Sequence, residues 1–178
     1  LAKARPGELN YGSASIGSIA HLAGELFKSM GGVNIEAAQY KGGAAAITAL
    51  VSGEVQQAIL DARLVAPHVK PGKLRALAVT SATPSLAVPG LPTVSAAGVP
   101  GYEAIGMTSI LAPGRTPAAI VSRLHQEIVR ALNLPDVKEK FLNGGAETVG
   151  NSPEQFAATI KSEIAKWDKV IRDTGIKL

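Results

Sequence analysis

Short β-type runs alternate with helical patterns in the first part of the chain, and this order constrains the fold more than any other feature. Four apolar or β-branched runs predict strands at residues 9–12, 35–40, 55–60 and 74–80, the last buried on both faces. Three helical patterns predict helices at residues 19–30, 44–51 and from 61 to near 71. Such alternation predicts an α/β domain with a parallel or mixed sheet and crossover helices.

The pattern changes after residue 80. Residues 81–101 are rich in Pro, Gly, Ser and Thr, which predicts a long surface connection with one helical turn near residues 93–97. A long strand is predicted at residues 102–111, and a short one near residues 147–149. Helices are predicted at residues 118–132, 136–142 and 153–174. Ser152, Pro153 and Gln155 predict a capping box at the start of the last helix.

Two of these C-terminal helices carry apolar stripes at helical spacing. The residues are Ile120, Leu124, Ile128 and Leu132 in one helix, and Phe156, Ile160, Ile164, Trp167 and Ile171 in the other. An exposed stripe of this size is unusual on a monomer. We therefore expect a partner to cover them, either an N-terminal segment that forms half of a second lobe, or another copy of the chain.

Composition excludes several classes of function. The net charge is +4, but the basic residues are spread along the chain and aromatic residues make up only 4%, so no nucleic-acid-binding surface is expected. The absence of cysteine excludes disulfides, thiolate zinc sites and cysteine nucleophiles. The three histidines do not show metal-binding spacing, and we expect no metal and no cofactor. Glycine, proline or charge interrupts every apolar run before it could span a bilayer. Residues 1–6 do not have the pattern of a signal peptide, and we expect processing or truncation before them.

Three strand-to-helix junctions carry the residues that could bind a ligand. They are the loop with Ser13, Ser15, Gly17 and Ser18, the turn with Tyr40, Lys41, Gly42 and Gly43, and Asp61. In a parallel sheet these junctions meet at the carboxyl edge, where open α/β sheets bind ligands. Each places a helix N-terminus there, with its unpaired N–H groups and positive dipole end. The arrangement predicts a site for a carboxylate or phosphate oxygen.

Each junction also has an ordinary structural interpretation. Ser18 and Asp61 are good N-caps, and the two glycines make a good turn. Lys41 could neutralise the ligand or could be a solvated loop lysine. Ser18 and His21 could suggest a nucleophile and its base, but the chain lacks a GxSxG elbow and a third member, so an enzyme is not expected. We expect His21 to form a buried hydrogen bond or line the pocket. The loop lacks GxGxxG spacing, and the turn lacks the ending of a P-loop.

Six segments resemble, in order, the extracytoplasmic solute receptors of tripartite tricarboxylate transporters, the TctC or Bug-type receptors. They are LNYGSASIGSIAHLAGELFKSMGGV, YKGGAAAITALVSGEV, KLRALAVTS, LPTVSAAGVPGYEA, LAPGRTPAAIVSRL and GNSPEQFAATIKSEIAKW. The resemblance implies a type II periplasmic-binding-protein fold. In that fold residues 1–105 would form one complete ligand-binding lobe. Residues 106–178 would supply a crossover strand and helices to a second, incomplete lobe.

The resemblance also implies a function. The chain would act in the periplasm and deliver a small carboxylate, such as a dicarboxylate, tricarboxylate, acidic amino acid or aromatic acid, to membrane transporter subunits. Ser13, Gly17, Ser18 and His21 match the family's Ser/Gly loop, and the Tyr40–Gly42 turn and Asp61 match its other two contacts. A sensing or interaction module without a transport role remains an alternative.

The sequence departs from the family at three places. Ser15 stands where the family often has glycine. Met107, Thr108 and Ser109 replace a motif of two aromatic residues and glycine that is common among relatives. Relatives also carry further residues before this start, including the glycine-rich loop of the lobe that is incomplete here. The ligand of a relative therefore cannot be transferred to this chain.

Overall fold

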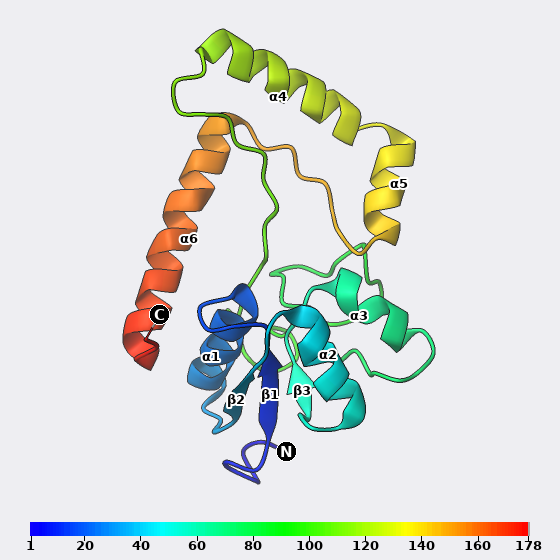
Figure 1. Cartoon of the computed structure of the whole chain (residues 1–178), viewed down its shortest axis with the longest axis vertical. Coiled ribbons are helices and arrows are strands. Elements are labelled where there is room, and N and C mark those ends of the chain that lie inside the picture. Colours follow the sequence, from blue (N-terminus) through cyan, green and yellow to red (C-terminus); the bar gives the residue numbers. More distant parts are fainter. Residues whose placement is uncertain (178) are drawn as a thin grey trace.

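Three short parallel strands form the sheet around which the chain is organised. The structure is a computed structural model that describes residues 1–177. The strands are β1 (Asn10–Ser13), β2 (Glu36–Gln39) and β3 (Gln57–Ala58), and their order is β2-β1-β3. Tyr11 of the central strand pairs with Ala37 on one side and Gln57 on the other. Because all three strands are parallel, their carboxyl ends share one edge, as the sequence predicted (Figure 1).

Helices α1 (Ile19–Gly31) and α2 (Gly43–Ser52) cover opposite faces of this sheet. Tyr11 lies against Gly24 of α1, since a Cβ atom on that glycine would meet the tyrosine ring at 2.2 Å. Gly12 lies against α2, since its Cβ would come within 3.7 Å of the Ala46 side chain. Successive strand residues point to opposite faces, so the two helices sit on either side of β1. Helix α3 (Ala62–Val69) packs beside α2.

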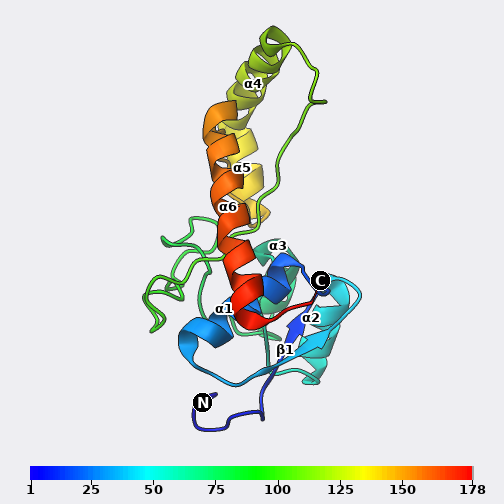
Figure 2. The same ribbon diagram turned by 90° about the vertical axis from the view of Figure 1, so that its left-hand side faces the viewer.

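Helix α1 is buried on its outer side as well. Ala23 packs with Tyr102 and Ala104, at the start of the segment of residues 102–111, and with Trp167 of helix α6 (Pro153–Thr174). The Tyr102 hydroxyl donates to the Ala23 carbonyl at 2.9 Å, and its ring meets Phe27 edge to face. Figure 2 shows α6 running along α1. The C-terminal helix thus returns to the body that carries the sheet.

Helices α4 (Ala118–Leu132) and α5 (Pro135–Asn143) stand apart from the sheet as an arm (Figure 1). Every residue in the two helices is at least partly exposed, and Ile120 and Leu124 are 50% and 49% exposed. The predicted helices of the C-terminal part are confirmed, and so is the capping box at Ser152 and Gln155. Within residues 1–177, no helix combines the length and apolar character needed to cross a bilayer.

Three predicted strands are wrong. Residues 74–80 form only one bridge, between Val79 and Thr93, and Leu77 is 66% exposed and so not buried on both faces. Residues 102–111 and 147–149 are extended, with no strand paired to them within residues 1–177. A pleated run becomes a strand only where a neighbour supplies the other half of the hydrogen-bond ladder. The predicted helical turn at residues 93–97 is confirmed by the bond from the Ala97 amide to the Thr93 carbonyl.

The contact between Tyr11 and Gly24 yields a stability prediction. Gly24→Ala should lower the free energy of unfolding by about 1–3 kcal/mol, because the new methyl group must displace a buried ring. Gly31→Ala, in the last turn of the same helix, is the matched control. Its Cβ would meet nothing closer than 3.7 Å, so the gain in helix propensity of about 1 kcal/mol should leave it neutral or more stable. Urea unfolding measures both, and equal stabilities would contradict the packing of α1 on β1.

Candidate functional site

Backbone hydrogen bonds hold the first two predicted junctions side by side. The Tyr40 amide donates to the Ser13 carbonyl at 2.9 Å, and the Gly42 amide donates to the Ala14 carbonyl at 2.7 Å. These bonds extend the pairing of β1 and β2 past the ends of the strands. The loop of residues 13–18 and the turn of residues 40–43 therefore form one continuous rim at the carboxyl edge of the sheet. We call these two segments, with Asp61, the rim.

The first junction is a loop closed by its own side chains. Ser18 caps α1, since its Oγ accepts from the His21 amide at 3.3 Å and donates to the Ser15 carbonyl at 2.7 Å. The hydroxyl of Ser13, which is fully buried, also faces the Ser15 carbonyl at 3.5 Å. The Gly17 amide donates to Nδ1 of His21 at 3.2 Å. Thus the two hydroxyls and this amide serve the loop itself, and Ser15 and Ile16 form its exposed surface.

The second junction starts α2 without a capping side chain. Gly42 has φ +97°, a conformation that favours glycine, and Lys41 beside it is exposed. The amide groups of the first turn have no partner within an α-helix, so they can bind an acceptor at the rim. The Tyr40 hydroxyl points elsewhere and donates to Glu54 at 2.9 Å. Gly43 is crowded, because its Cβ would lie 2.7 Å from Cδ1 of Leu64 on α3.

The third junction, at Asp61, caps α3. The Asp61 carboxylate accepts from the Arg63 amide at 2.9 Å and from Nη2 of the Arg63 guanidinium at 2.6 Å. The hydrogen bond with this guanidinium is the main cause that lowers the pKa of Asp61 below its ordinary value. The carboxylate is therefore ionised and paired. An anionic ligand near Asp61 would meet an ion pair and not a lone negative charge.

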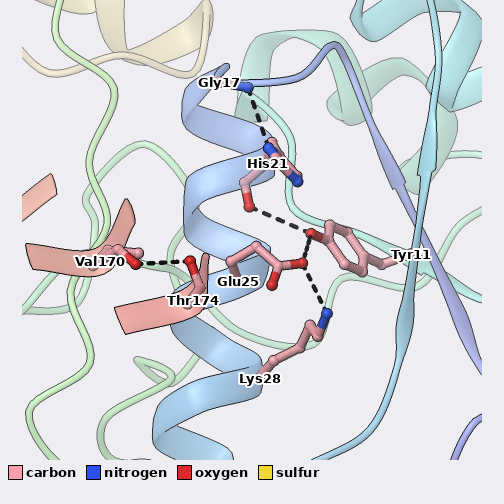
Figure 3. A network of polar contacts seen from close by, with 7 residues as sticks. All are labelled: Tyr11, Gly17, His21, Glu25, Lys28, Val170 and Thr174. Atoms are coloured by element: carbon pink, nitrogen blue, oxygen red, sulfur yellow. Dashed lines mark hydrogen bonds and ion pairs between the residues drawn. The ribbon is translucent and has the colours of Figure 1, made fainter. Parts of the chain in front are cut away.

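A buried polar network connects the first junction to the sheet (Figure 3). The Tyr11 hydroxyl donates to Glu25 at 2.8 Å and lies 3.4 Å from the His21 carbonyl, and Lys28 binds the same carboxylate at 2.9 Å. Burial, together with the Glu25 hydrogen bond, raises the pKa of Tyr11. This network was not among the predictions made from the sequence. Its signal was present, since His21, Glu25 and Lys28 repeat at helical spacing on one face of α1.

His21 is a structural acceptor in this arrangement. Burial lowers its pKa below the ordinary value, with the charge of Lys28 acting in the same direction and that of Glu25 opposing it. The neutral ring can accept the Gly17 amide at Nδ1. The Ser18 hydroxyl binds the His21 backbone amide and the Ser15 carbonyl, so the hydrogen bonds of this serine and histidine do not form a nucleophile–base pair. The expected buried hydrogen bond of His21 is confirmed.

The rim is a junction of backbone groups and not a metal centre. Within residues 1–177, no three His, Asp or Glu side chains gather in a metal-binding cluster.

In the sheet order β2-β1-β3, the chain leaves β1 toward α1 and leaves β3 toward α3. Ligands of doubly wound sheets bind where neighbouring strands lead off in opposite directions. The loop after β1 and Asp61 after β3 flank this position.

Comparison with known proteins gives matches over almost the whole chain. A sequence model described as "Tripartite tricarboxylate transporter family receptor" matches residues 1–176. The protein BugT of Bordetella pertussis is 38% identical over 99% of this chain and 54% of its own length. A protein from the tcbD-tcbE intergenic region of a Pseudomonas strain is 36% identical over 96% of this chain and 51% of its own length. The chain thus spans about half the length of these relatives.

Solved structures match at the level of the fold. The structure of R. palustris Rpa4515 with adipate superposes with a TM-score of 0.87 at 39% identity, covering 98% of this chain and 58% of that one. The structure of the periplasmic binding protein BugD gives 0.73 at 26% identity, covering 99% and 60%. MatC from Rhodopseudomonas palustris with bound malate gives 0.72 at 26% identity, covering 96% and 59%. The predicted periplasmic-binding-protein fold is confirmed.

The buried acceptor role of His21 leads to a prediction on pH. The folded chain has the lower His21 pKa, so the unfolded chain binds the proton first as pH falls through the ordinary histidine value of about 6.5. The wild type should therefore lose stability between pH 7.5 and pH 5.5. In His21→Asn the side-chain oxygen can still accept the Gly17 amide but cannot titrate, so this part of the loss should disappear. Urea unfolding of both chains at the two pH values measures the difference. The same loss in both would contradict the role assigned to His21.

Proposed function

The chain belongs to the tripartite tricarboxylate transporter receptor family, and on that premise we propose that it binds a small carboxylate at the rim. The matched family consists of receptors and not of enzymes, in line with the expectation that the chain is not an enzyme. The proposed role is to collect the acid in the periplasm and deliver it to membrane transporter subunits. The relatives solved with adipate and with malate support a carboxylate as the class of ligand.

The observation that carries this proposal is the bond from the Gly42 amide to the Ala14 carbonyl. It brings the N-terminal ends of α1 and α2 together at one edge, where their positive dipole ends favour an anion. The exposed Ser15 and Lys41 add a hydroxyl and a cation on either side of this bond. Two helix N-termini, a hydroxyl and a lysine are groups that complement a carboxylate.

In this proposal some residues of the rim would contact the ligand, and others would hold the loop and the turn in shape. The amides near Ser15 and Gly43, with the Lys41 ammonium, would face the ligand, and Gly42 would provide the close approach of the backbone. Ser13, Gly17, Ser18 and His21 would hold the loop in shape through the hydrogen bonds described above. Tyr40 and Asp61 would anchor the turn and the start of α3 through Glu54 and Arg63.

The geometry makes weak binding the expectation for this chain alone. Each charge-assisted hydrogen bond contributes about 1.5–3 kcal/mol. Two or three of them give an affinity in the millimolar to micromolar range after the cost of association. Tight binding would need a second surface to bury the ligand from the other side.

Binding of dicarboxylates tests the proposal. Adipate and malate, titrated into the full chain and followed by calorimetry and thermal shift, should bind and raise the melting temperature. Lys41→Gln should weaken binding by up to about fivefold, the scale of one exposed charge pair. Lys3→Gln is the matched control, because it removes the same charge before β1, at the opposite edge of the sheet. Equal affinities for the two variants, or no binding of any carboxylate at millimolar concentration, would refute the role of the rim. A ligand that stabilises the chain but is not taken up by the membrane transporter would favour the sensing module instead.

The apolar stripes of α4 and α6 support a second proposal, about partners. Ile120 and Leu124 are half exposed, Ile164 is 64% exposed, and an open apolar groove of about 390 Å³, which Ile164 lines, lies between α6 and residues 105–107. Ile110 and Leu111, at the end of the segment of residues 102–111, are exposed as well. We propose that further polypeptide covers this surface, either as the rest of the second lobe, to which residues 106–178 would belong, or as a second copy of the chain.

Sedimentation velocity shows whether a second copy of the chain covers this apolar surface. At micromolar concentration the chain should self-associate or bind a hydrophobic dye at this surface, because apolar area of this extent is unfavourable in water. Ile164→Lys should decrease self-association, dye binding or both. Lys161→Ala, an exposed residue on the same helix, is the control. A monomer that binds no dye would contradict the proposal.

A further inference from the structure

A second groove, between α2 and α3, takes no part in the roles assigned so far. One stripe of α2 at helical spacing lines it: Ala44, Ile47, Thr48, Val51 and Ser52. The opposite side is formed by Leu64 and His68 of α3 and by Lys73, which follows this helix. The groove has a volume of about 500 Å³. Since its lining residues span nearly the whole of α2, it runs along the helix axis.

The shape of this groove suits a helix. Two helices that pack side by side leave a trough between them, and the side chains of a third helix can fill it. The floor is apolar and only partly covered, since Val51 is 40% exposed and Leu64 is 44% exposed. An amphipathic helix binds such a trough through apolar side chains at positions i, i+4 and i+7.

The charge of the lining residues indicates which kind of helix would bind in this groove. His68 and Lys73 line it, and no carboxylate does. The sequence contains no Asp or Glu from residue 62 to residue 102, so no acidic residue from this segment offsets them. Arg63 is engaged by Asp61. An occupant with carboxylates at one end would complement the Lys73 ammonium and could accept a hydrogen bond from the His68 ring, and a positive charge there would be repelled by Lys73.

The two ends of the groove differ. Leu64 packs on Gly43 at the first turn of α2, directly behind the turn of residues 40–43. His68 comes one turn later in α3, and Lys73 lies beyond its end. The apolar end of the groove therefore adjoins the rim, and the basic end points away from it. A helix lying in the groove would contact the side chain that supports the Gly42–Gly43 turn.

We propose that this groove is a docking site for an acidic amphipathic helix of a protein partner. Apolar side chains of the partner lie against Val51 and Leu64, and its carboxylates lie near His68 and Lys73. Because the charged contacts are exposed, docking weakens as salt is added. The site goes beyond the proposed function and does not require that the rim bind a carboxylate, so the two ideas fail separately.

A synthetic helical peptide tests the proposal on the full chain, with no carboxylate ligand present. The peptide has leucines at positions i, i+4 and i+7 and glutamates at one end, and a matched peptide has lysines in place of the glutamates. Amide chemical shifts report binding residue by residue. The glutamate peptide should shift residues 43–52 and 62–73 and bind about fivefold tighter than the lysine peptide at low salt, the scale of exchanging attraction for repulsion at one exposed cation, Lys73.

Two variants and one control complete the test. Val51→Glu places a carboxylate on the floor and should abolish binding of the glutamate peptide, whereas Leu77→Glu, at an exposed leucine outside the groove, should not change it. Lys73→Glu, at an exposed lysine, should reverse the preference between the two peptides. Circular dichroism checks that each variant is folded. The proposal is overturned by absence of peptide binding, by equal affinity for both peptides, or by equal effects of Val51→Glu and Leu77→Glu.

Discussion

The double burial of β1 is the constraint on which the rest of the structure depends. This strand has only four residues, yet it pairs with both neighbours and packs against a helix on each face. Tyr11 faces α1, and Gly12 faces α2, where a Cβ atom on Gly12 would lie 3.7 Å from the Ala46 side chain and only 3.2 Å from that of Val55. Because the strand points its carboxyl end toward the loop of residues 13–18, the position of this loop follows from the packing of β1.

The sequence was informative wherever a pattern could be satisfied locally. The helices of residues 118–132 and 153–174 and the capping box at Ser152 depend on neighbours within a few residues, and the structure has them as predicted. The strand predicted at residues 102–111 depends on a partner far away in the chain, and a pattern of apolar residues cannot supply one. This run lies extended, with exposed side chains such as Ile110. Apolar character alone therefore predicts where a strand could form and not whether it pairs.

The candidate site shows the same division between local and distant information. Spacing placed Ser18, Gly42 and Asp61 after successive strands, and the parallel sheet brings the first two junctions into hydrogen-bond contact. The partners of the side chains could not be predicted in this way. Glu54 binds Tyr40 from the far end of α2, and Nδ1 of His21 turns back to the Gly17 amide. The choice at His21 depends on burial, because a buried ring nitrogen needs a partner, whereas the Tyr40–Glu54 bond joins exposed groups.

Several donors at the rim already form hydrogen bonds within the chain, and these bonds determine which groups are left to bind a ligand. Exchanging an internal acceptor for a carboxylate brings little net free energy, since one hydrogen bond replaces another. In the proposed site the Gly17 amide and the Ser18 hydroxyl would therefore contribute mainly by holding the loop in one conformation, which would lower the entropy lost on binding. The first-turn amides of α2 differ from them, because Gly42 brings no side chain that could cap them. A ligand there would pair with amides that no side chain caps, and so the uncapped helix, more than the capped one, is where binding free energy could be gained.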